Sequence, residues 1–131
     1  MIHLTVVTPA RKLVDQEVDE VVLPGAEGYF GVMEGHAPFL TTLRVGRLEY
    51  RRGGETSNLA VAWGFVEVLP KSVRVLADVA ERAEDIDVER ATGAQQRAEE
   101  RMRKGGDIDW DRARSALEKA IVRLQVAGMN R

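Results

Sequence analysis

Cysteine is absent from the 131 residues, and this absence excludes disulfide scaffolds, thiolate nucleophiles, iron–sulfur clusters and cysteine-ligated zinc. The chain has only two histidines, His3 and His36, and neither belongs to a histidine–carboxylate motif with metal-ligand spacing. The three serines lack the G-x-S-x-G context of a hydrolase nucleophile. We therefore expect no metal site, no catalytic residue and no enzymatic activity of the chain itself.

The sequence also lacks a strong charge of either sign and a long apolar run. Its formal net charge is −2, whereas a nucleic-acid binder usually carries a clear excess of Lys and Arg. No stretch approaches the roughly 20 apolar residues of a membrane-spanning helix. The first residues have the pattern of a β-strand and lack the basic segment and the small-residue cleavage site of a signal peptide. We expect a soluble intracellular protein of bacterial type, with no nucleic-acid partner.

Proline and aromatic residues are few and unevenly placed. All four prolines and six of the seven aromatic residues lie within residues 1–80, which hold 18 charged residues. The shorter segment 81–131 holds 22 charged residues and many alanines. Proline and aromatics are typical of strands and turns, while dense charge with alanine is typical of exposed helices. We predict two domains, residues 1–84 and residues 85–131.

The first domain has the pattern of short strands separated by turns. Apolar runs rich in valine and leucine end at Pro9, Pro24 and Pro70, and several alternate with polar residues. Gly53-Gly54 joins two such runs and predicts a hairpin with a type I′ turn, in which both central residues have positive φ. These features predict an N-terminal antiparallel β-sandwich or flattened barrel.

The second domain changes to a helical period. The break at 105–107, followed by Asp109 as a helix cap, predicts an antiparallel hairpin of two α-helices. The predicted seam is rich in alanine, and it comprises Val88, Ala91, Ala94, Ala98 and Met102 facing Trp110, Ala113, Leu117, Ala120, Ile121 and Leu124. Small side chains bury little area, so this hairpin is either a weakly docked, switchable element or a fixed helical cap.

The glycine-rich stretch 25–38 is the most unusual local sequence. It lacks the Lys-Ser/Thr pair of a phosphate-binding loop, so a set of tight turns explains its glycines better than phosphate binding does. Tyr29, Phe30 and Met33 lie within it, and loops on rigid sandwiches often carry binding residues. A protein contact is the alternative interpretation.

Taken together, several motifs resemble those of the epsilon subunit of F-type ATP synthase, and they lie at 27–41, 63–68, 73–78, 81–91 and 107–113. The resemblance covers almost the whole chain. It implies a β-sandwich of about ten strands and a helical hairpin, in a non-catalytic central-stalk (rotor) subunit. It also implies that the sandwich binds the gamma subunit and sits on the c-ring, with Tyr29, Phe30, Met33 and His36 as the contact residues.

The resemblance further implies that the complex couples hydrogen ion transport to ATP synthesis. The chain would then lie at the cytoplasmic face of the bacterial plasma (inner) membrane, as a peripheral protein held there only through the complex. The family's hairpin, when extended, reaches the catalytic alpha/beta subunits and inhibits ATP hydrolysis. Arg112, Arg114, Lys119 and Arg123 are the cations that it would present to an acidic surface.

Some family members bind ATP as a regulatory ligand when the hairpin is folded down, and no cofactor is otherwise required. By this resemblance the nucleotide-binding residues are Glu81, Ile86, Asp87, Arg90, Ala91, Arg97, Lys119 and Arg123. Lys119 departs from the family pattern, where an arginine stands, and thereby loses the planar fork that binds phosphate. The alternative interpretation is that Asp87 caps a helix while Arg90 and Arg97 face water.

Two other functions compete with the rotor subunit. One is a free-standing ATP-sensing module with the same fold. The other is a small enzyme that uses the cleft between sandwich and hairpin, which the missing nucleophile and metal motifs disfavour.

Overall fold

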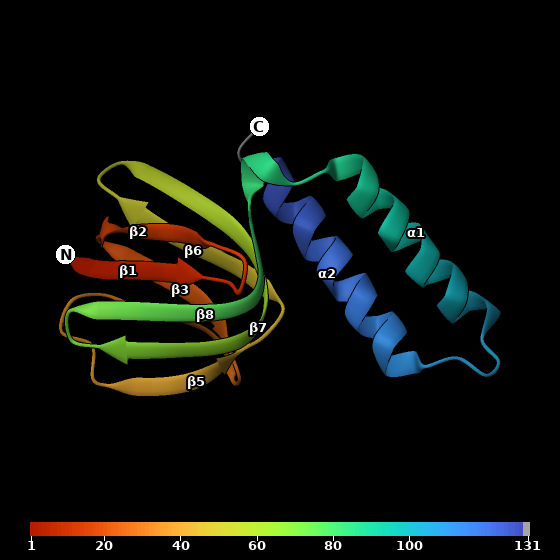
Figure 1. Ribbon diagram of the computed structural model, residues 1–131, viewed down its shortest axis with the longest axis horizontal. Coiled ribbons are helices and arrows are strands. Elements are labelled where there is room, and N and C mark those ends of the chain that lie inside the picture. Colours follow the sequence, from red (N-terminus) through yellow and green to blue (C-terminus); the bar gives the residue numbers. More distant parts are fainter. Residues whose placement is uncertain (130–131) are drawn as a thin grey trace.

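The computed structural model describes residues 1–129, and within that range the chain forms eight strands, one short 3₁₀-helix and two α-helices. The strands are β1 (Ile2–Val7), β2 (Lys12–Val18), β3 (Glu20–Gly25), β4 (Gly28–Val32), β5 (Phe39–Leu43), β6 (Gly46–Arg52), β7 (Glu55–Leu69) and β8 (Ser72–Arg82). The helices are η1 (Ala83–Asp85), α1 (Val88–Lys104) and α2 (Trp110–Met129). Figure 1 shows the strands gathered into one body and the helices lying beside it. The predicted sandwich and hairpin are confirmed.

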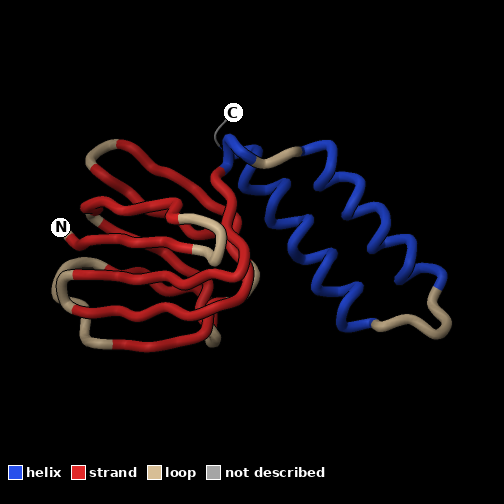
Figure 2. Tube along the Cα trace, in the orientation of Figure 1, coloured by secondary structure: helices blue, strands red, loops and turns tan. Residues whose placement is uncertain are grey.

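The strands form one sheet that folds back on itself. Their order is β2-β1-β8-β7-β5-β3-β4, and β6 pairs with both β3 and β7. Because β6 connects these two strands, the sheet closes into a flattened barrel around a single core (Figure 2). Every strand pair in residues 1–129 is antiparallel except β1 with β8, which is parallel. The long crossover that a parallel pair needs is supplied by the strands in between.

The eight strands in the described range are fewer than the ten or so that were expected. Two runs that the sequence separates at Trp63-Gly64 belong to one long strand, β7. Its register with β8 continues unchanged across the break, from Ala62 opposite Val79 to Gly64 opposite Ala77. The backbone turns locally to positive φ, 58° at Trp63 and 130° at Gly64, without ending the strand.

The two-glycine hairpin forms where it was predicted, but its turn differs. Arg52 pairs with Glu55 across Gly53-Gly54, which makes a two-residue connection between β6 and β7. Of the two glycines only Gly53 has positive φ, at 61°. A type I′ turn requires positive φ at both central residues, so the predicted turn type is wrong.

The sandwich core consists of strand side chains alone. The largest fully buried ones are Ile2, Leu4, Leu23, Leu43, Leu48 and Leu59, followed by six valines. Burying a side chain of this size stabilises a fold by about 1.5–3 kcal/mol relative to leaving it exposed. No residue of α1 or α2 within 1–129 belongs to this core, so the sandwich does not depend on the hairpin for its interior.

The hairpin has the predicted cap at Asp109 and the predicted alanine seam, and Asp87 caps α1 as the alternative interpretation of that residue expected. Arg90 N–H donates to Asp87 Oδ1 at 3.0 Å and Arg112 N–H donates to Asp109 Oδ1 at 3.0 Å, so both carboxylates cap helices. Gly105 ends α1 with a φ of 65°. The buried seam residues are Ala91, Ala98, Ala113 and Ala120, whereas Trp110 is exposed at the start of α2. Neither helix in residues 1–129 is long and apolar enough to cross a bilayer. Residues 130–131 of the predicted hairpin lie outside the described range.

Candidate functional site

The hairpin meets the sandwich through one face of α2. This helix contacts β6, β7 and η1, while α1 packs along its other side (Figure 1). A small apolar cluster fills the junction near the C-terminal end of α2, and it consists of Ala60, Ala83, Ile86, Val126 and Ala127 with Val88 and Val122 packed against it. Most of these side chains are small, so the junction buries less apolar area than the sandwich core does.

An ion pair lies beside this apolar cluster. Arg123 of α2 places Nε at 2.8 Å from Glu81 Oε1, and its Nη2 donates to Glu81 Oε2 at 3.2 Å. The side chains are 21% and 25% exposed respectively, so both are largely withdrawn from water. Only the Nη2 contact has hydrogen-bond geometry, whereas Nε approaches the carboxylate as an ion pair and is buried without a hydrogen-bond partner among the described residues.

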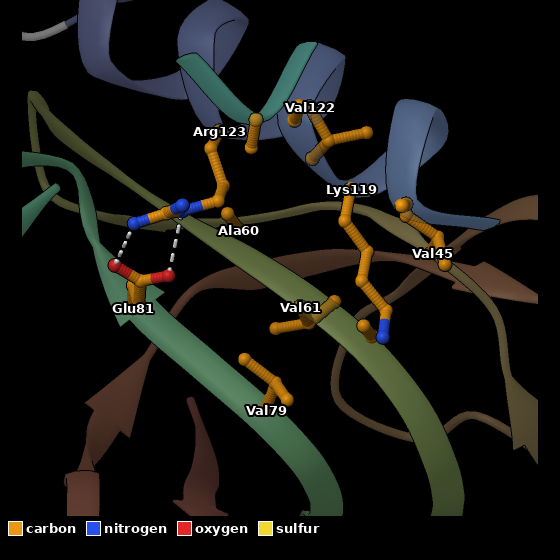
Figure 3. A pocket seen from close by; sticks show the side chains of 12 residues that line it. Val45, Ala60, Val61, Val79, Glu81, Lys119, Val122 and Arg123 are labelled. Carbon is orange, nitrogen blue, oxygen red and sulfur yellow. Dashed lines mark hydrogen bonds and ion pairs between the residues drawn. The ribbon is translucent and has the colours of Figure 1, made fainter. Parts of the chain in front are cut away.

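Beyond the ion pair, α2 and the sandwich separate to leave an open pocket of about 260 Å³. Its wall is mostly apolar, formed by Val45, Ala60, Val61, Ala62, Val79, Ala94, Ala116, Ala120 and Val122. Glu81, Lys119 and Arg123 are its charged residues. Figure 3 shows Lys119 reaching from α2 across the pocket while Arg123 points to Glu81. The pocket therefore offers an apolar surface with two cations and one carboxylate.

The structure brings together only some of the residues that the resemblance implies for nucleotide binding. Glu81, Lys119 and Arg123 line the pocket. The other five do not: Ile86 is buried in the apolar junction, Ala91 is buried in the helix seam, Asp87 caps α1, and Arg90 and Arg97 are exposed. Arg97 lies against the surface of α1 near Gly93, outside this pocket.

Of the four candidate inhibitory cations, two line the pocket and two lie outside it. Arg112 and Arg114 are exposed, and Arg114 Nη1 lies 3.5 Å from Asp111 Oδ1. Lys119 and Arg123 face the sandwich across the pocket. In this arrangement of the hairpin, two of the four cations line the pocket and two lie on the exposed surface of α2.

The candidate contact residues of the glycine-rich stretch differ in exposure. Tyr29 and Met33 are more than half exposed, although the Tyr29 hydroxyl accepts a hydrogen bond from Arg47 N–H at 3.0 Å. Phe30 packs against the sandwich core and meets Phe39 edge-to-face. His36 is half-buried, and its Nδ1 lies 2.7 Å from Ala37 O. Tyr29 and Met33 are thus the members available to a partner, while Phe30 has a packing role.

Sequence reasoning missed an apolar patch on the outer face of the sandwich. Leu40 of β5, Phe65 of β7 and Leu76 of β8 are 70%, 56% and 51% exposed. Phe65 is paired directly with Leu76, so these side chains sit on neighbouring strands. The available signal was the run 65–69, in which apolar residues occupy four of five positions instead of alternating. We call Leu40, Phe65 and Leu76 the outer apolar patch.

His3 lies in a network of charged residues on β1 and β2. Its Nδ1 is 3.0 Å from Glu17 Oε1 and its Nε2 is 2.5 Å from Asp15 Oδ1, while Lys12 Nζ donates to Asp15 Oδ2 at 3.0 Å. Hydrogen bonds to Glu17 and then Asp15 raise the pKa of His3. Hydrogen bonds from Lys12 and then His3 lower the pKa of Asp15.

These shifts predict a pH window for the network. The His3 contribution to stability is complete below its unfolded pKa of about 6.5 and is lost as pH rises through the raised folded value. The Asp15 contribution is present above its ordinary 3.8 and is lost as pH falls through the lowered folded value. We expect an NMR titration to give His3 a pKa above 6.5 that falls in Glu17→Gln and not in Glu55→Gln. A His3 pKa at or below 6.5 contradicts the network.

The fold is a β-sandwich that is joined through η1 to a helical hairpin. Residues 1–83 match the family described as ATP synthase, Delta/Epsilon chain, beta-sandwich domain, and residues 84–128 match its long alpha-helix domain. The chain belongs to the ATP synthase delta/epsilon chain family.

Curated relatives and solved structures agree with this family. The ATP synthase epsilon chain of Desulforamulus reducens is 50% identical over 95% of this chain and 96% of its own length. That of Geobacter metallireducens is 46% identical over 97% of this chain and 94% of its own length. A chain of the Euglena gracilis mitochondrial ATP synthase, in an OSCP/F1/c-ring structure, superposes with a TM-score of 0.83 at 26% identity, over 96% of this chain and 80% of that one.

A chain in the central stalk/c-ring structure of the Tetrahymena thermophila mitochondrial ATP synthase shares the fold, with a TM-score of 0.62 at 11% identity over 98% of this chain and 95% of that one. Epsilon chains are stalk subunits of ATP synthase and not its catalytic subunits, so the family confirms the expectation of a non-catalytic chain.

Proposed function

We propose that this chain is a central-stalk subunit that links gamma to the c-ring and couples proton flow to ATP synthesis. The observation that carries this proposal is the full-length match to epsilon chains, with 46–50% identity to curated relatives. The Euglena chain, which shares the fold and 26% of its residues, comes from a structure that includes F1 and the c-ring. The chain would be held peripherally at the cytoplasmic face of the bacterial plasma membrane through these partners.

Two exposed surfaces of the sandwich suit two protein partners. The outer apolar patch is a candidate for the gamma contact, because an exposed cluster of large apolar side chains is stabilised by burial in an interface. Tyr29 and Met33, exposed on and after β4, are the candidate contact with polar loops of the c-ring. The patch lies on β5, β7 and β8, whereas Tyr29 and Met33 lie on and after β4, so different residues of one sandwich would meet the two partners.

We expect Phe65→Ser to reduce recovery of gamma with a tagged chain at least about tenfold, since truncating a central interface aromatic commonly costs 2 kcal/mol or more. Phe65 is 56% exposed, so the fold should persist. Glu55→Gln, at the β6–β7 turn, is the matched control and should leave recovery unchanged. Full recovery of gamma by the Phe65→Ser variant would show that the outer apolar patch is not part of the gamma interface.

The hairpin is proposed to inhibit ATP hydrolysis when it leaves the sandwich. Docking places Lys119 and Arg123 in the pocket that faces the sandwich, so in that arrangement they are not presented to the alpha/beta subunits. Release would expose them beside Arg112 on the same side of α2, with Arg114 also available. An acidic surface of the alpha/beta subunits is the complementary partner.

ATP is proposed as the ligand that favours the docked hairpin. The pocket combines an apolar wall, which suits a base, with Lys119 and Arg123, which suit phosphates. Arg90 and Arg97 point elsewhere in the present arrangement, so their participation requires movement of side chains or of α1 toward the ligand. Binding would stabilise the docked state by mass action.

We expect ATP at about 100 times its Kd to stabilise the isolated chain by about 2.7 kcal/mol, seen as a rise in melting temperature. Arg90→Ala and Arg123→Ala should abolish this rise, whereas Arg52→Ala on the distant β6 turn should preserve it. A rise that persists in both variants would exclude this site. ATP binding together with failure to recover gamma would favour a free-standing ATP-sensing module.

A further inference from the structure

One ion pair attaches the hairpin to the sandwich, in addition to a contact in which Arg47 Nη1 of β6 donates to Met129 Sδ of α2 at 3.6 Å. Glu81 lies near the end of β8, on the sandwich side of η1, and Arg123 lies on α2, on the hairpin side. Within residues 1–129 theirs is the only ion pair that joins α1 or α2 to a strand. A rotation of the hairpin about η1 would therefore have to break it.

The environment of the pair makes it stronger than an ordinary surface contact. The two side chains are only 21% and 25% exposed, and the guanidinium meets both carboxylate oxygens. Charges that are largely withdrawn from water are screened little by salt, and breaking such a pair in place leaves two poorly hydrated charges. By contrast, Glu67 and Arg74 on the open sheet face lie 3.9 Å apart and are 48% and 63% exposed.

The apolar contacts beside the pair are limited. The junction cluster contains three alanines among its five buried residues. Farther along α2, Lys119 lines the open pocket between this helix and the strands. Small apolar residues position the helix loosely, so the directional ion pair adds a large share of the preference for one docked geometry.

We propose that Glu81 and Arg123 form a latch that holds the hairpin on the sandwich without any ligand. This proposal rests on the proposed switching of the hairpin. The Glu81–Arg123 ion pair is the contact that must break when the hairpin is released. On release both charges regain water, which offsets part of the lost attraction. Release of the hairpin is thus more readily reversed with an ion pair than with an apolar contact of the same area.

Hydrogen exchange of the full-length chain, with no nucleotide and no other subunit, tests the latch. Glu81→Gln and Arg123→Gln should each speed exchange of the α2 amides roughly three- to tenfold, because docking is lost more often. Exchange in β1 to β7 should stay at the wild-type rate. The charge swap Glu81→Arg with Arg123→Glu should restore slow exchange, since the pair re-forms with its ends reversed.

Glu67→Gln breaks the exposed Glu67–Arg74 pair and is the matched control, with α2 exchange expected at the wild-type rate. The latch is overturned if α2 exchange in both single variants stays within about twofold of wild type, or if the strands speed up equally, which would indicate general destabilisation. Because this readout needs no complex, failure of the latch is distinguishable from failure of the proposed inhibition of ATP hydrolysis, which is measured in the assembled enzyme.

Discussion

A chain ending at Asp85 is expected to raise ATP hydrolysis by the assembled complex at least about fivefold over the full-length chain, a typical size for one regulatory coupling. The change removes α1 and α2, and with them the four cations proposed to act on the alpha/beta subunits. Gamma should be recovered with this truncated chain as well as with the full-length one, because the outer apolar patch lies on the strands.

The shortened chain should fold because the sandwich core contains no hairpin residue within 1–129. Its main loss is the cover over Ala60 and Ala83, two small side chains. The measurement is steady-state ATP hydrolysis of complexes assembled with either chain. Glu118→Gln in the full-length chain, an exposed change on α2, is the control and should keep hydrolysis low. Equal rates of ATP hydrolysis with both chains would show that this hairpin does not inhibit hydrolysis.

Gly64→Ala is expected to produce the largest loss of stability of any conservative change in the sandwich. A Cβ at this position would lie 1.9 Å from the backbone oxygen of Leu76, and the residue has a φ of 130°. Neither strand can move aside easily, because Gly64 and Ala77 are paired in the centre of the sheet. We expect a loss of about 3 kcal/mol or more in the free energy of unfolding.

That loss corresponds to a fall in melting temperature of about 10 °C or more for a domain of this size. Gly31→Ala on β4 is the matched control, because a Cβ there meets nothing within 4 Å and the φ is not positive. Its melting temperature should change little. If the Gly64→Ala variant has the melting temperature of the wild type, the backbone of β7 does not adopt the positive φ described at this position.

Local patterns predicted the elements that depend on local physics. Asp87 and Asp109 have the right spacing ahead of helical periods, and both cap helices. The alanine seam is likewise a consequence of one-dimensional periodicity, and it is buried as predicted. The bend at Trp63-Gly64 shows the limit of this reasoning, because a glycine that ends a strand and a glycine that bends one leave the same local signal.

Tertiary placement accounts for what the sequence could not predict. The pairing of Glu81 with Arg123 depends on how α2 lies against β7, and no spacing rule relates residues 42 positions apart. The same applies to Arg90 and Arg97, which lie near Asp87 in the sequence but outside the pocket. The exposure of Leu40, Phe65 and Leu76 reflects a sheet face that no other element within residues 1–129 covers.

Co-purification of the tagged full-length chain from its host tests the central claim most directly. The claim is that this sandwich and hairpin act as a stalk subunit of a rotary ATP synthase. The predicted result is stoichiometric recovery of gamma together with the alpha and beta subunits, in a complex that also contains the c-ring. Recovery of the chain alone, under conditions that keep the rest of the complex assembled, would contradict it.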